Sequence, residues 1–345
     1  MSNAPALLPA PDPHPRTPED VRSAIATLHE GISSMRSQVR RALLGQDRVV
    51  SEVLCCLLAD GHALLEGVPG TGKTTLVQAI SQAAGLDFGR VQFTPDLMPA
   101  DITGTTIVVD GDGGRRGTVF RPGPIFHALV LADEINRATP RSQSALLEAM
   151  EERHVTIGGQ THPLPRPFIV LATQNPIEQE GTYRLPEAQL DRFMMKINMP
   201  LPPAEVIEGI IASTTGGPRQ SIACRVSDDF LISATALCRR VIVAPHVDRW
   251  IASLIHATTA TLGTLVATPA SPRAALAMRR TAQVAAISAG RMAVSIADVL
   301  AVAPACLRHR LSPGPDARAA GLDGDALVDQ LLEAVPTPAQ EVLPR

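Results

Sequence analysis

One stretch, Gly67 to Thr74 (GVPGTGKT), constrains this chain more than any other, because it fits the pattern GxxxxGK[ST] between an apolar segment and a helical one. The glycines allow backbone N–H groups to close around a β-phosphate at a helix N-terminus. Lys73 supplies a charge for the β- and γ-phosphate oxygens, and Thr74 supplies a hydroxyl for Mg²⁺. The alternative is a plain Gly-rich turn. The predicted ATP-binding residues are Gly67, Val68, Pro69, Gly70, Thr71, Gly72, Lys73, Thr74 and Thr75.

Five short apolar segments between residues 62 and 199 predict the strands of one sheet: HALLEG, FGRVQF, HALVLAD, PFIVLAT and MMKINM. Most are continuously apolar, which is typical of parallel strands that are buried on both faces. We therefore expect an α/β fold with helices on both faces of a parallel sheet. Two β-hairpins interrupt the alternation, one over residues 102–120 with a Gly-rich tip and one over residues 155–164 with Gly158-Gly159 at its turn.

The remaining chain divides into three parts. Residues 1–16 are rich in Pro and Ala without a periodic apolar face, which predicts a disordered arm. Thr17-Pro18 predicts a capped helix start. After Pro200 the strand pattern stops, and helix caps are expected at Ser227, Ser271 and Ser295. We expect an arm over 1–16, a nucleotide-binding α/β core over 17–200 and a small all-helical domain over 201–340.

Polar residues follow two of the predicted strands. Asp133-Glu134 follows the apolar run from His127 to Ala132, and Asn175 comes two residues after PFIVLAT. Ligands bind at the carboxyl edge of open α/β sheets. We expect Asp133 to hold Mg²⁺ through water, Glu134 to polarise the attacking water, and Asn175 to orient that water beside the γ-phosphate. Taken alone, the acids could cap a helix and Asn175 could form a turn before Pro176, but the phosphate loop favours the catalytic interpretation.

Two arginines are further candidates. Arg192 follows a short predicted helix beside the fifth strand, and Arg273 lies in the first turn of a helix in the second domain. A cation at a helix N-terminus opposes the macrodipole, so a bound phosphate is a reasonable compensation. A surface salt bridge is the alternative for either arginine.

The composition narrows the classes of function. Lys plus Arg is 31 and Asp plus Glu is 34, a net charge of −3, and aromatic residues are only 3%, which argues against nucleic acid as a partner. The five cysteines have the spacing of neither a disulfide framework nor a zinc site. Apolar runs fall short of a membrane span, and the first residues do not resemble a signal peptide. We expect a cytoplasmic protein without a membrane span.

From about residue 44 to residue 338, the sequence resembles the MoxR subgroup of AAA+ ATPases, which lies near the magnesium-chelatase ATPase subunits. The resemblance rests on Gly45-Gln46, LLEGVPGTGKT, VQFTPDLMPADITG, FRPGPIFHALVLADEINRA, QSALLEAMEERHVTI, FIVLATQNPIEQEGTYRLPEAQLDRFMMKI, SPRAALAM and LRHRL. Arg184 stands where we expect Pro in the family, and the Pro-rich arm is additional.

The resemblance implies a P-loop domain with a helical lid, assembled into a homohexameric ring whose ATP sites lie between subunits. The hairpins match the family's helix-2 insert and pre-sensor insert. By position, the roles implied are Walker A for Lys73 and Thr74, Walker B for Asp133 and Glu134, sensor 1 for Asn175, the arginine finger for Arg192, sensor 2 for Arg273, and adenine contact for Gly45 and Gln46.

Three functions remain open at this point. The favoured one is Mg²⁺-dependent ATP hydrolysis that drives chaperone-like remodelling or maturation of protein complexes, with a von Willebrand factor A domain protein and a protein client as partners implied by the resemblance. A nucleic-acid-associated motor is the second, since Arg115-Arg116 could contact phosphates. A non-hydrolysing nucleotide-gated scaffold is the third, and the complete set of catalytic residues counts against it.

Overall fold

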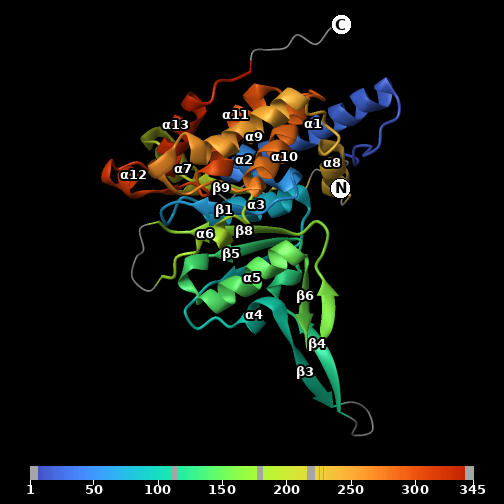
Figure 1. Ribbon diagram of the computed structural model, residues 1–345. Coiled ribbons are helices and arrows are strands. Elements are labelled where there is room, and N and C mark those ends of the chain that lie inside the picture. The colour runs from blue at the N-terminus through green and yellow to red at the C-terminus, as the bar shows by residue number, and fades with distance from the viewer. Residues whose placement is uncertain are drawn as a thin grey trace.

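The structure, a computed structural model, describes residues 7–110, 116–176, 182–215, 222–224, 226–227 and 229–338. Its centre is a five-stranded sheet of order β2-β5-β8-β1-β9, in which every neighbouring pair is parallel (Figure 1). The expected parallel α/β sheet is confirmed, and each of the five apolar segments matches one of its strands, with β8 running one residue past PFIVLAT. The strands are β1 (Ala63–Glu66), β2 (Phe88–Gln92), β5 (Leu129–Asp133), β8 (Ile169–Gln174) and β9 (Met195–Asn198).

The apolar character of these strands reflects burial on both faces. In β5, Leu129 and Leu131 pack into one hydrophobic core, whereas Val130 and Ala132 pack into another. The first core holds α1 (Pro18–Ala42), α2 (Asp47–Leu58) and α3 (Lys73–Ala84), and the second holds α5 (Pro140–Glu152). Because side chains alternate along a strand, a continuously apolar strand supplies both cores at once.

The chain after residue 203 is mainly helical and lies on the α1 side of the sheet (Figure 1). Caps at Ser271 and Ser295 are present, whereas the helix expected to begin at Ser227 has Asp229 as its N-cap. The region also contains a short antiparallel pair, so it is not entirely helical. Its elements are α7 (Ala204–Thr215), α8 (Phe230–Cys238), α9 (Pro245–Ala260), η3 (Gly263–Leu265), β10 (Val266–Thr268), α10 (Pro272–Ser288), α11 (Ile296–Leu307), β11 (Ser312–Pro313), α12 (Pro315–Ala319) and α13 (Gly324–Ala334).

The described part of the N-terminal arm corrects the expectation of disorder. Leu8 forms a parallel bridge with Val226, and its carbonyl accepts a hydrogen bond from the Ser227 backbone N–H at 2.9 Å. Pro11 and Pro15 are buried. An extended Pro-rich segment can pair along an edge of the fold and bury its rings, and composition does not reveal that partner.

Both expected hairpins are present. β3 (Gly104–Asp110) pairs with β4 (Arg116–Pro122), and this hairpin projects away from the sheet (Figure 1). The tip over residues 111–115, including Arg115, lies outside the described residues. β6 (His154–Ile157) pairs with β7 (Gln160–Pro163). Phe120 of β4 stacks on His162 of β7 with ring centroids 4.0 Å apart, so the two hairpins support each other.

Short elements complete the α/β region: α4 (Pro99–Thr103), η1 (Pro124–Phe126), η2 (Ile135–Arg137) and α6 (Glu187–Leu190). Among the helices of the described chain, none combines the length and the apolar character needed to cross a bilayer.

The contact between α1 and α8 provides a test of the packing. A Cβ placed on Gly31 would lie 2.1 Å from Cζ of the buried Phe230. Gly31→Ala should therefore lower the free energy of unfolding by about 1–3 kcal/mol, measured by urea denaturation. Gly209→Ala is the control, because nothing lies within 4 Å of its Cβ position on exposed α7. It should be neutral or stabilising. Equal stability of the two variants would contradict this packing.

Candidate functional site

The phosphate loop connects β1 to the start of α3. Gly70 and Gly72 have φ angles of +84° and +93°, which glycine adopts without strain. Gly72 is the N-cap of α3 and no side chain caps that helix end. A Cβ on Gly67 would lie 2.6 Å from the Met199 carbonyl oxygen, so the loop approaches β9 closely. The loop therefore has the geometry of an anion-binding helix N-terminus.

A cavity of about 350 Å³ lies against this loop. It contains one ammonium, two threonine hydroxyls, two carboxylates and one amide, which together suit a triphosphate and a hard cation. Three of the predicted ATP-binding residues, Gly67, Val68 and Thr71, do not line it, and Thr71 instead donates its hydroxyl to the Val68 carbonyl at 3.0 Å, which shapes the loop. The lining residues are Pro69, Gly70, Gly72, Lys73, Thr74, Thr75, Asp133, Glu134 and Asn175.

The ammonium of Lys73 is held across the loop. Its Nζ donates to the Gly67 carbonyl at 2.5 Å and to the Val68 carbonyl at 3.1 Å. These carbonyls keep the charge beside the cavity, where it could bind phosphate oxygens. The chain has one other lysine, Lys196, which pairs with Glu66 at 2.8 Å.

The Asp133 carboxylate is almost fully buried and engaged at both oxygens. Thr173 donates its hydroxyl to Oδ1 at 2.7 Å, and Arg90 donates to Oδ2 at 2.7 Å. The Thr173 hydroxyl also accepts the Glu134 backbone N–H at 2.8 Å. One buried hydroxyl on β8 therefore fixes both acids at the end of β5.

Glu134 occupies an unusual backbone conformation, with φ at +58° in the left-handed region. Such non-glycine residues are strained and tend to occur at functional sites. Its Oε2 accepts a hydrogen bond from Gln92 of β2 at 2.9 Å and pairs with Arg137 at 3.1 Å. These contacts direct the carboxylate along the carboxyl edge of the sheet.

Sequence reasoning missed Arg90, Gln92 and Thr173. Thr173 ends the predicted strand PFIVLAT, and Arg90 and Gln92 alternate on β2, which pairs with β5. Only the order of strands in the sheet reveals that they face the two acids.

A divalent cation would fit at Thr74 and Asp133. Across the described part of the chain, no three His, Cys, Asp or Glu side chains come together as a metal-binding group. Mg²⁺ commonly binds through one or two carboxylates together with substrate phosphates and water, so the residues present match this mode. A cation near Asp133 would share its carboxylate with Arg90.

Gly45 and Gln46 lie outside this cavity's lining. Gln46 is buried and donates its side-chain amide to the Pro200 carbonyl at 2.8 Å. Gly45 has φ at +70°, and its Cβ position lies 2.7 Å from a methyl of Val206. Gln46 therefore bonds to the segment between β9 and α7, whereas Gly45 lies against the start of α7, and adenine contact by either one remains a prediction.

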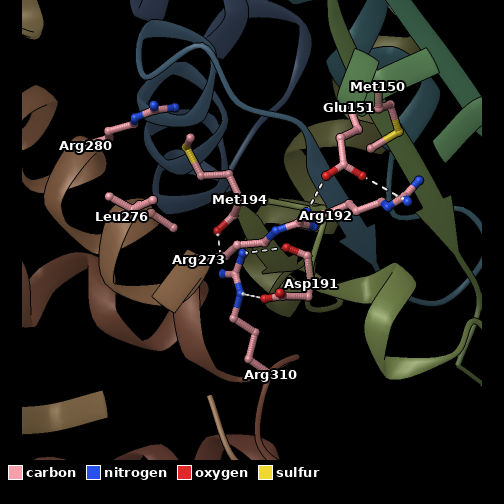
Figure 2. Close-up of a pocket in the computed structure, with 10 residues that line it drawn as sticks. Met150, Glu151, Asp191, Arg192, Met194, Arg273, Leu276, Arg280 and Arg310 are labelled. Carbon is pink, nitrogen blue, oxygen red and sulfur yellow. Dashed lines mark hydrogen bonds and ion pairs between the residues drawn. The ribbon is translucent and has the colours of Figure 1, made fainter. Parts of the chain in front are cut away.

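Arg192 and Arg273 lie together in a second cavity of about 220 Å³, which shares no lining residue with the first. Arg192 pairs with Glu151 at 2.9 Å, and Arg273 pairs with the other oxygen of the same carboxylate (Figure 2). The salt bridges considered as alternatives are thus present. Arg192 and Arg273 are brought to each other, but not to the phosphate loop of their own chain.

The backbone around Arg192 is fixed by a buried arginine from the C-terminal helical region. Arg310 donates to the Asp191 carboxylate at 2.7 Å and to the carbonyls of Asp191 and Phe193 at 3.0 and 2.8 Å. Ser271, the N-cap of α10, donates to the other Asp191 oxygen at 2.8 Å. Asp191 therefore connects the segment that carries Arg192 with the helix that carries Arg273.

The neighbouring His309 is a structural contact in this arrangement. Burial lowers the pKa of His309 well below its usual range, so the ring is neutral and donates Nε2–H to the Phe193 carbonyl at 2.9 Å. His309 belongs to the LRHRL motif, and the sequence alone does not reveal this contact.

Comparisons with known proteins agree with this geometry. Residues 62–195 match the model of the ATPase family associated with various cellular activities (AAA), and residues 262–331 match that of the AAA lid domain. The chain is 40% identical to Chaperone MoxR1 of Mycobacterium tuberculosis over 98% of this chain and 89% of that protein. It is 31% identical to Protein MoxR of Methylorubrum extorquens over 87% and 93%, respectively.

A solved structure is similar over nearly the same extent. The crystal structure of a suggested ATPase from Cytophaga hutchinsonii has a TM-score of 0.83 and 34% identity, covering 91% of this chain and 97% of that one.

The cavity at the phosphate loop predicts two separable losses. Lys73→Ala should weaken ATP binding roughly 10- to 100-fold, because a charge-assisted contact to phosphate is removed. Glu134→Gln should bind ATP normally but hydrolyse it about 100-fold more slowly or worse, because only water activation is lost. Calorimetric titration and phosphate release measure the two effects. Lys196→Ala, which removes the lysine outside the cavity, serves as the control. Equal loss of binding in Lys73→Ala and Glu134→Gln would refute this division.

Proposed function

Because the chain belongs to the MoxR family of AAA ATPases, we propose that it hydrolyses ATP with Mg²⁺ and uses the energy in chaperone-like remodelling of protein complexes. The observation that carries the proposal is the single cavity that gathers Lys73, Asp133, Glu134 and Asn175 at the phosphate loop. A scaffold that only senses nucleotide would not need this complete hydrolytic set.

The proposed roles follow from the contacts. Lys73 and the N-terminus of α3 bind the phosphates. Thr74 and Asp133 would hold Mg²⁺, which would supply charge neutralisation for the phosphates. Glu134, held by Gln92 and Thr173, accepts a proton from the attacking water, and Asn175 orients that water.

We further propose that ATP is hydrolysed between subunits of a homohexameric ring. Arg192 and Arg273 lie in a cavity separate from the phosphate loop of their own chain. Both are half-exposed and can approach an anion on a neighbouring molecule. A catalytic arginine supplied by a partner is worth about 10³ to 10⁵ in rate in related P-loop systems.

The proposed client surface is the β3–β4 hairpin, whose Val108 and Val119 are exposed. It leads through η1 into β5, which ends at Asp133, so it is covalently linked to the hydrolytic site. A von Willebrand factor A domain protein is the partner we propose to present the client. Arg116 pairs with Asp110 at 3.5 Å, which reduces the basic charge that would favour a nucleic-acid motor.

We place this activity in the cytoplasm. All five cysteines are unpaired, which suits a reducing compartment. Burial raises the pKa of the Cys306 thiol to about 11 and that of Cys238 to about 12, so these thiols are inert.

Mixed rings test catalysis between subunits. Arg192→Ala and Glu134→Gln chains should each be inactive alone but regain hydrolysis when mixed, because some interfaces then combine Glu134 from one chain with Arg192 from the other. Steady-state ATPase activity of rings verified by native mass spectrometry is the measurement. Mixing Arg192→Ala with the double variant Glu134→Gln/Arg192→Ala is the control, and it should show no recovery. Failure of the first mixture to recover would contradict the proposal.

A second mixture determines on which subunit Arg273 acts. If both arginines serve the neighbour's ATP, a mixture of Arg192→Ala and Arg273→Ala chains has no mixed interface with both arginines and should stay inactive. If Arg273 serves its own chain's ATP, the same mixture should recover activity. Because Arg192 and Arg273 bind the same Glu151 carboxylate, we expect the first outcome.

The hairpin is tested by capture from the native cells. Glu134→Gln rings loaded with ATP should retain bound proteins. Replacing residues 110–116 of this variant by a short Gly-Ser turn should remove most of those proteins. The same replacement in a chain that keeps Glu134 should leave basal ATPase activity and assembly intact. If the shortened protein no longer assembles, or captures the same proteins, the hairpin does not contact clients.

A further inference from the structure

The carboxylate of Glu151 lies between the two arginines that we assign to the neighbouring ATP site. Its Oε2 pairs with Arg192 at 2.9 Å and its Oε1 pairs with Arg273 (Figure 2). A single carboxylate thus offers one oxygen to each guanidinium, as two oxygens of one phosphate group would. This bridging contact involves residues from α5, from the segment after α6 and from α10.

The position of Glu151 is unfavourable for the helix that carries it. It lies in the last turn of α5. That turn also contains Glu152 and has no basic residue. Acidic side chains at a helix C-terminus oppose the macrodipole. Glu151 is therefore placed against the preference of its own helix, and its compensation comes from the two arginines.

The surrounding cavity carries an excess of positive charge. Four arginines line it, against the two carboxylates of Glu151 and Asp191. Asp191 is engaged by the buried Arg310, which leaves Glu151 to offset Arg192 and Arg273. Their side chains are 30% and 47% exposed, so an anion from outside can reach them.

We infer that Arg192 and Arg273 form an anion site that the chain's own Glu151 covers, and that the γ-phosphate of a neighbouring subunit's nucleotide replaces Glu151 on assembly. The inference deepens the proposed function and rests on it for the identity of the anion. Glu151 then acts as an internal competitor. It keeps the arginines together in the single chain and raises the concentration of neighbour and ATP needed for an active interface.

Binding of inorganic tripolyphosphate tests the covered site without ATP hydrolysis. The Lys73→Ala background weakens the phosphate loop, and adding Glu151→Gln should make tripolyphosphate binding about three- to ten-fold tighter, because two partly exposed ion pairs no longer compete. Gln keeps the shape of Glu and suits the helix end better, so folding should be retained. Calorimetric titration at low protein concentration is the measurement.

Matched variants identify the source of the gain. Glu152→Gln makes the same change of charge at the same helix end, yet Glu152 pairs with neither arginine in the structure, so it should leave binding unchanged. Adding Arg192→Ala or Arg273→Ala to Lys73→Ala/Glu151→Gln should abolish the gain. No gain with Glu151→Gln, or an equal gain with Glu152→Gln, overturns the inference.

The neighbour's role is measured separately. With Lys73 intact, Glu151→Gln should lower the protein concentration for half-maximal ATPase activity about two- to ten-fold. A higher midpoint with lower maximal activity would mean that Glu151 positions the arginines for catalysis, which overturns competition. If tripolyphosphate binding tightens but wild-type activity per chain does not depend on concentration, the covered anion site stands and the proposed catalysis between subunits fails.

Discussion

The carboxylate of Asp191 joins the α/β region to the helical region that follows residue 203. The positions of Arg192 and Arg273 depend on this contact. One oxygen accepts from Arg310 and the other from Ser271, so a single side chain connects the edge of the sheet, the end of α11 and the start of α10. Arg310 is buried and also donates to backbone carbonyls on both sides of Arg192. Removing the Asp191 carboxylate would leave the buried Arg310 guanidinium without its charge partner, which is destabilising. The arginine pair is therefore positioned by the fold.

A comparable role belongs to Thr173 at the phosphate loop. Its hydroxyl donates to Asp133 and accepts from the Glu134 backbone, which helps to hold Glu134 in its left-handed conformation. From there the chain passes through η2 into α5, where the buried Gln143 donates to the carbonyls of Ile135 and Ala138. The thirteen residues of α5 span about 20 Å and include Glu151 in the last turn. One rigid helix thus lies between the hydrolytic acids and the arginine pair.

The local parts of this arrangement could be predicted from the sequence. The phosphate loop, the five strands and the acids at the end of β5 follow from short patterns, since the residue order directly reflects the chemistry of the loop and the burial of both strand faces. Arg90 and Gln92 could not be assigned because their role depends on β2 pairing with β5. Glu151 could not be paired with Arg192 and Arg273, which lie far along the chain. The prediction of a disordered arm failed for another reason. The Pro-rich composition does not reveal that the arm pairs with the segment around Val226.

The most direct measurement is a structure of the Glu134→Gln chain assembled with ATP and Mg²⁺. We expect the γ-phosphate beside Lys73 and Asn175 of one subunit and within about 4 Å of the Arg192 and Arg273 guanidinium groups of the next, with Glu151 withdrawn from both. Arginines that remain on Glu151, or that contact the nucleotide of their own chain, would contradict it.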